Sequence, residues 1–118
     1  MAVQVFTKAL LSGSTNGKGI KVVAIATAGT VIHTATSSTT AFDEIWLYAY
    51  NGHTADVVLT IEWGEATVPD GNDIITIPYK SGRFLVIDGR LLNNSLVVRA
   101  FASVANVIVI DGFVNQIT

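Results

Sequence analysis

The feature of the sequence that most constrains the fold is a pair of strongly alternating segments, Glu44–Tyr50 and Asp56–Trp63. In the first segment aliphatic and aromatic side chains alternate: Ile45, Leu47 and Ala49 form one set, and Trp46, Tyr48 and Tyr50 form the other. In the second segment one alternate set is fully apolar: Val57, Leu59, Ile61 and Trp63. Because the side chains of a strand point to opposite faces with period two, both segments are predicted to be strands.

The link between these two segments, residues 51–55, begins with Asn51-Gly52. This dipeptide tolerates the positive φ that tight hairpin turns require. We therefore expect the two segments to pair as a β-hairpin. Since the hairpin carries both tryptophans and two of the three tyrosines, it is expected to supply much of the buried aromatic area.

Other short apolar segments are expected to form the remaining strands: Ala2–Leu11, Ile20–Thr27, Thr30–Thr36, Asp73–Pro78, Arg83–Asp88, Ser95–Ser103, Val104–Ile110 and Phe113–Ile117. A turn is expected at Gly89–Asn94, and a kink or bulge at Asp111-Gly112. About eight short strands with frequent turn signals are typical of all-β folds. The chain is predicted to be a single-domain β-sandwich or jelly-roll-like barrel of mostly antiparallel strands.

A length of 118 residues suits one domain. We expect residues 20–118 to form the β-sandwich. Residues 1–19 are expected to be an extended N-terminal arm, or a first strand, followed by a flexible Gly- and Ser-rich loop. This segment is predicted to pack at least partly on a neighbouring subunit, because an arm can add a strand to a neighbour's sheet.

Composition narrows the classes of function. The seven basic residues are scattered and the net charge is −2, so no nucleic-acid-binding face is expected. Only 14% of residues are charged, against about 25% in ordinary soluble domains. The longest uncharged run, Val22–Phe42, is too rich in Ser and Thr to predict a membrane span. Extensive contact with other subunits is the remaining explanation for so apolar a chain.

No residue pattern predicts an enzyme, a cofactor or a metal. His33 and His53 lack a paired-ligand spacing, so a solvent-facing turn histidine and a strand histidine bonded to nearby hydroxyls are expected. Four carboxylates fall around one loop: Glu62, Glu65, Asp70 and Asp73. A pair of them could serve glycoside hydrolysis, and residues 69–73 could supply oxygen ligands for calcium. Without a diagnostic spacing, solvated loop residues are the favoured interpretation.

The aromatic set Trp46, Tyr48 and Tyr50 shares one strand face. Such a face can stack sugars or bases, fill a core, or form a subunit interface. Core or interface is favoured, because large aromatic side chains usually go to buried area first. The residues expected at interfaces are Val3, Val5, Phe6, Trp46, Tyr48, Val97, Phe101 and Val107.

Three stretches carry a resemblance to a known class: MAVQVFTKALLSG at the start, GIKVVAIATAGTVIHTATSSTT, and VIVIDGFVNQIT at the end. Their Thr-, Ser-, Gly-, Ala- and Val-rich style resembles the small virion structural proteins of tailed bacteriophages, and is nearest to capsid decoration, or cement, proteins. The resemblance covers the whole chain as style and pattern, without a signature motif, so no functional residue is carried over.

The resemblance implies a non-enzymatic subunit that bridges and stabilises major capsid protein subunits. It implies a homotrimer, seated on the outer capsid surface of the virion and made in the host cytoplasm. Two alternatives stay open: another virion β-sandwich component of the tail or head–tail connector, and a carbohydrate-binding module. The second would use Trp46, Tyr48, Tyr50 and the loop 65–73.

Overall fold

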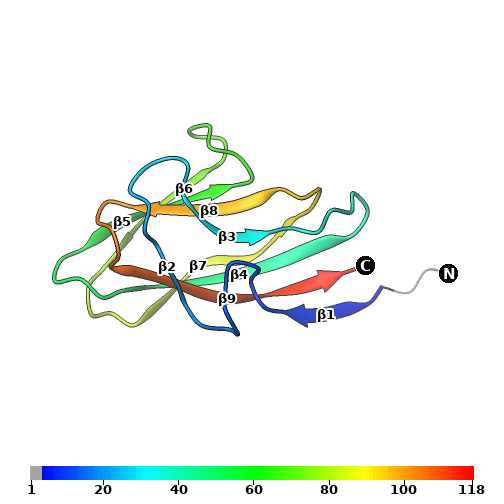
Figure 1. The fold of residues 1–118 in the computed structure, drawn as a ribbon, viewed down its shortest axis with the longest axis horizontal. Helices are drawn as coiled ribbons and strands as arrows, with labels where there is room; N and C mark the ends of the chain where they lie inside the picture. Colours follow the sequence, from blue (N-terminus) through cyan, green and yellow to red (C-terminus); the bar gives the residue numbers. More distant parts are fainter. Residues whose placement is uncertain (1–3) are drawn as a thin grey trace.

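The computed structural model describes residues 4–118, which form nine strands and no helix, and therefore no helix long and apolar enough to cross a membrane (Figure 1). In chain order the strands are β1 (Phe6–Ala9), β2 (Ile20–Lys21), β3 (Thr30–Thr34), β4 (Phe42–Asn51), β5 (Val57–Trp63), β6 (Asn72–Ile77), β7 (Arg83–Leu92), β8 (Val97–Ala102) and β9 (Ile108–Ile117). They make two antiparallel sheets that pack face to face. The predicted all-β sandwich is confirmed.

The strand order identifies the type of sandwich. Sheet A has the order β1-β9-β4-β7, with β2 also paired to β9, and sheet B has the order β3-β8-β5-β6. The pairs are nested: β2 with β9, β3 with β8, β4 with β7, and β5 with β6. This is one long antiparallel hairpin rolled into two layers, which is the arrangement of an eight-stranded jelly roll, with β1 added at the edge of sheet A.

The predicted hairpin between β4 and β5 is wrong, although both strands exist. β4 belongs to sheet A and β5 to sheet B, so the link between them crosses from one layer to the other (Figure 1). The buried Asn51 side chain explains the crossing. Its Nδ2 donates to the carbonyl oxygens of Ala55 and Ile77, at 3.0 and 2.8 Å, and its Oδ1 accepts from the His53 N–H. Asn51 thus fastens the end of β4 to the opposite sheet instead of forming a tight turn.

The core between the sheets is aliphatic. Its largest fully buried apolar side chains are Leu11, Ile32, Ile45, Leu47, Leu59, Ile61, Ile77, Ile87, Ile108 and Ile110. None of the ten aromatic side chains, all of which lie within residues 4–118, belongs to the buried set. The expectation of a buried aromatic hairpin is therefore wrong, because β4 turns its aliphatic side inward and its aromatic side outward.

Two glycines make strands longer than predicted. β7 runs through Gly89, where a turn was expected; Gly89 has φ +84° and lies at a register shift against β4. β9 runs through Gly112 in unbroken register with β4, where a kink or bulge was expected. A Cβ at Gly112 would lie 1.9 Å from the carbonyl oxygen of Trp46, so only glycine permits this close approach. In contrast, the predicted strand Ile20–Thr27 is reduced to the two residues of β2.

The N-terminal segment lies on its own domain. β1 pairs with β9 of the same chain, Leu11 is buried in the core, and the Gly13 N–H donates to the Ile32 carbonyl at 3.0 Å. The start of β1 and the end of β9 lie side by side at one end of the sandwich (Figure 1). Val5 and Phe6 nevertheless remain 53% and 63% exposed, so packing on a neighbouring subunit stays a prediction. Val3 lies outside the described residues.

Candidate interaction surface

The outer side of sheet A carries most of its large side chains on β4 and β9. Because the two strands pair in register, outward residues stand opposite each other: Phe42 with Ile117, Trp46 with Phe113, Tyr48 with Asp111, and Tyr50 with Val109. Phe6 of β1 extends this set beyond Ile117. We call these six aromatic residues the aromatic face: Phe6, Phe42, Trp46, Tyr48, Tyr50 and Phe113. Phe6, Phe42 and Tyr50 are exposed, and Trp46, Tyr48 and Phe113 are half-buried.

Trp46 is the centre of the aromatic face. Its ring stacks on that of Phe113, with 6.0 Å between centroids and 12° between planes. The Lys8 ammonium lies 4.9 Å from the Phe113 centroid. On β7, Gly89 leaves room for Trp46, since an added Cβ would lie 2.9 Å from Trp46 Cζ2. These contacts hold the rings in place before any partner binds, so little side-chain entropy remains to be lost on binding.

Glu44 accepts a hydrogen bond from the indole N–H of Trp46, the polar group of this cluster. Its Oε1 accepts a hydrogen bond of 2.7 Å from Trp46 Nε1 and one of 3.0 Å from Asn115 Nδ2. The hydrogen bond from Trp46, with that from Asn115, lowers the pKa of the Glu44 carboxyl below its ordinary value. The indole N–H therefore needs no acceptor from a partner, which suits Trp46 to an apolar contact.

The residues predicted at interfaces fall into three places. Phe6, Trp46 and Tyr48 lie together on sheet A, with Val5 just before β1. Val97 and Phe101 are half-buried on the outer side of sheet B, so they cannot share one flat contact with the aromatic face. Val107 packs against the core. Sequence reasoning missed Phe113, because only the pairing of β4 with β9, distant in the chain, brings it to Trp46.

The outer side of sheet B is built differently. Glu62 points outward from β5, yet it is only 2% exposed, so the expectation of a solvated carboxylate is wrong. Its two oxygens accept from the Thr27 hydroxyl at 2.8 Å and from the Gly29 N–H at 2.6 Å. The segment carrying these donors crosses β8 at Ala100. A Cβ on Gly29 would lie 2.6 Å from the Ala100 backbone, so glycine allows the crossing.

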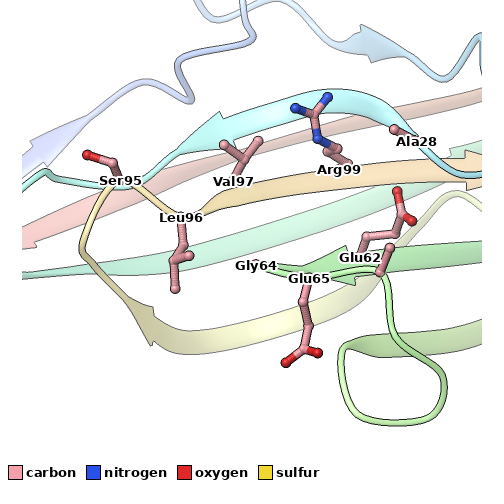
Figure 2. A pocket seen from close by; sticks show the side chains of 9 residues that line it. Ala28, Glu62, Gly64, Glu65, Ser95, Leu96, Val97 and Arg99 are labelled. Carbon is pink, nitrogen blue, oxygen red and sulfur yellow. The ribbon is translucent and has the colours of Figure 1, made fainter.

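Beside Glu62 lies an open cavity of about 300 Å³ that Glu65 and Arg99 also line (Figure 2). Glu62 and Arg99 are direct cross-strand neighbours. Figure 2 shows the Glu65 carboxylate pointing away from Arg99. The two glutamates do not face each other across this cavity, so the arrangement lacks the opposed carboxylates that glycoside hydrolysis uses.

The remaining acidic candidates do not gather into a metal site. Asp73 forms an ion pair with Arg90 of β7, whose guanidinium also lies 4.4 Å from the Trp63 ring. Asp70 is exposed on the loop between β5 and β6. Over residues 4–118 no group of three or more His, Asp or Glu side chains is arranged to hold a metal ion.

The two histidines differ in their surroundings. His33 is buried, and its Nε2 lies 2.8 Å from Asp43 Oδ2, while its Nδ1 accepts a hydrogen bond of 2.9 Å from the Ser12 N–H. The ring proton therefore sits on Nε2 and is donated to Asp43. The expected bonds to hydroxyls are replaced by a carboxylate and a backbone N–H. Nδ1 holds Ser12 beside β3, and Nε2 joins β3 to Asp43 of β4 in the opposite sheet. His53 lies half-buried in the link between β4 and β5.

In comparisons with protein-family models, with curated proteins and with solved structures, no match to the chain was found.

Proposed function

We propose that this chain is a non-enzymatic structural protein that docks on a protein partner through the aromatic face. The finer proposal is a capsid decoration subunit of a tailed bacteriophage, with the major capsid protein as the partner. The observation that carries the docking proposal is that no aromatic side chain belongs to the fully buried core, and that six aromatic residues gather on the outer side of sheet A.

Physical arguments support a protein partner. Aromatic side chains bury 150–250 Å² each, and Trp and Tyr dominate the binding energy of interfaces. The cluster around Trp46 is already ordered and its N–H is already bonded, so burial adds little entropic or desolvation cost. With 14% charged residues, the chain has few means of keeping such a face in water as a monomer.

The choice of a virion rests on the sequence style and the fold class. Jelly rolls occur in viral capsid and lectin domains, among others. A fold hosts many functions, so this support is by analogy. A tail or head–tail connector protein would have the same style and the same fold.

Particle composition tests the virion proposal. Mass spectrometry of purified virions should find this chain at a copy number similar to that of the major capsid protein. Purified chain should also sediment with heads that lack it. Absence from particles would overturn the proposal, and a few copies on the tail would replace it with the connector or tail alternative.

We also propose that the free protein is a homo-oligomer. Closed symmetry hides apolar surface without forming open fibres, and the number three comes from the resemblance to decoration proteins. Light scattering coupled to size exclusion should give three times the chain mass of 12.5 kDa. A monomer at micromolar concentration would remove the oligomer but leave docking on a capsid lattice testable.

A further inference from the structure

We propose that a hollow at one end of the aromatic face binds a neutral pyranose sugar. The hollow has a volume of about 400 Å³ and is lined by Tyr50, Gly82, Arg83, Val109 and Asp111. Its volume falls within the range of small-ligand sites, about 300–1,000 Å³. This inference does not depend on the chain being a virion protein.

Three strands of sheet A build the hollow. Tyr50 of β4 stands between its two register partners, Arg83 of β7 and Val109 of β9. Asp111 lies two residues further along β9, on the same outward side as Val109, and forms an ion pair with Arg83. Gly82 precedes β7, and an added Cβ there would meet no atom within 4 Å. Three paired strands therefore form the floor of the hollow, and Gly82 lies at its edge.

The groups that line the hollow match the two sides of a pyranose. Tyr50 is 42% exposed, and its ring offers an aromatic surface to the apolar C–H side of a sugar. The side chains of Arg83 and Asp111 are 65% and 19% exposed. Arg83 provides N–H donors and Asp111 provides carboxylate acceptors, which is what adjacent sugar hydroxyls need. Because these two charges balance, the hollow favours a neutral sugar over an acidic one.

The other rings of the aromatic face are less suited to this role. Trp46 and Phe113 stack on each other, and Lys8 and Gly89 lie against them. Tyr50 is instead the aromatic residue that lines the hollow, next to an ion pair. The platform expected from the sequence is thus divided: Trp46 belongs to a packed cluster, and Tyr50 faces open space beside polar groups.

Protein-observed NMR tests the site directly. The full ¹⁵N-labelled chain is titrated with millimolar maltose, cellobiose, lactose or N,N′-diacetylchitobiose, with 3′-sialyllactose as the acidic comparison. At least one neutral disaccharide should shift the amide signals of Tyr50, Val109 and Asp111, more strongly than sialyllactose does. Tyr50→Ala should weaken that binding about tenfold or more, a loss of about 1.4 kcal/mol. Asp111→Asn should also weaken it.

Phe42→Ala is the matched control. Phe42 is on the same strand and the same side, is 38% exposed, and lies about 27 Å from Tyr50 at the strand rise of about 3.4 Å per residue. This substitution should leave the sugar affinity unchanged. No shift with any of the neutral sugars would overturn the site, as would equal weakening by Tyr50→Ala and Phe42→Ala. Stronger binding of sialyllactose would overturn the preference for neutral sugars. Because no capsid is present in the experiment, its failure leaves the proposed docking function untouched.

Discussion

The outer faces of the two sheets differ in which side chains they carry and in how far the chain covers them. Sheet A presents six aromatic side chains that are exposed or half-buried, and its outward carboxylate Glu44 accepts hydrogen bonds from Trp46 and Asn115. Sheet B turns Glu62 outward and then buries it under a crossing segment, whose Thr27 and Gly29 donate to both oxygens. The chain itself thus covers the part of sheet B around Glu62, and the aromatic face of sheet A stays at the surface.

The difference shows what covering a sheet face requires. Burial of a carboxylate is costly unless donors replace water, and sheet B has them because glycine lets the chain pass over Ala100. Aromatic rings need no such donors, so the aromatic face can remain at the surface until a partner binds. We therefore expect substitutions on sheet B to act on folding, and substitutions on sheet A to act on binding.

The largest expected loss of stability comes from adding a side chain to Gly29, in the segment that crosses β8. Gly29→Ala places a Cβ within 2.7 Å of the Ala100 backbone, so either the crossing or β8 must move. The free energy of unfolding, measured by urea denaturation, should fall by about 3 kcal/mol. The control is Gly82→Ala, where the added Cβ meets no clash. Only the positive φ of +76° is unfavourable for alanine there, and it should lower the free energy of unfolding by about 1–2 kcal/mol. Equal losses for both variants would show that Gly29 is not held against β8.

The next effect tests the buried carboxylate. Glu62→Ala leaves the Gly29 N–H without its acceptor, and should lower the free energy of unfolding by about 2 kcal/mol. Glu62→Gln should cost less, because its amide oxygen can accept from Gly29 and its NH₂ can donate to the Thr27 hydroxyl. On sheet A, Glu44→Ala should cost less than about 1 kcal/mol, since water can replace the half-exposed carboxylate. A larger loss at Glu44 than at Glu62 would reverse the comparison.

Trp46→Ala tests whether the aromatic face of sheet A contributes to binding. Its removal should weaken binding to the partner about tenfold or more, because Trp residues are frequent hot spots of interfaces. Its effect on unfolding should be smaller than that of Glu62→Ala. Phe101→Ala removes a half-buried aromatic ring from the outer side of sheet B and is the matched control. Co-sedimentation with heads measures both variants, and equal weakening would argue against a specific role for sheet A.

The smallest expected effect is a pH dependence at Glu44. Its pKa is lowered in the folded chain, chiefly by the Trp46 hydrogen bond, from an ordinary value of 4.5. A lowered folded pKa contributes stability that is fully present above pH 4.5 and is lost as the pH falls through the folded pKa. The stability difference between the wild type and Glu44→Gln should therefore shrink as the pH drops below 4.5. A difference that stays constant from neutral pH to pH 3 or so would contradict this assignment.

Local patterns in the sequence predicted the class of the fold and most of its strands. Alternation at β4 and β5 correctly divided each strand into two sets of side chains, but it did not predict which set of β4 faces the core. It did not predict which strands pair, because the information at Asn51-Gly52 fits a tight turn as well as a crossing. The choice depends on contacts of the Asn51 side chain with Ile77, which lies 26 residues away in the chain.

The candidate surface was predicted only in part, for a related reason. Trp46 and Tyr48 were named from one strand, but their neighbours Phe113 and Asp111 come from β9 through register alone. The burial of Glu62 also depends on a distant segment, since Thr27 is 35 residues away. Sequence periodicity reports which side of a strand a residue occupies, and not what covers that side.

Cryo-EM of purified virions tests the central proposal most directly. We expect density for this jelly roll on the outer capsid surface, oriented with Trp46 and Phe113 against the major capsid protein or a second copy of the chain. The outer side of sheet B should not supply the main contact. Density in which the aromatic face points to solvent would contradict docking through sheet A, and particles without the chain would contradict the virion assignment itself.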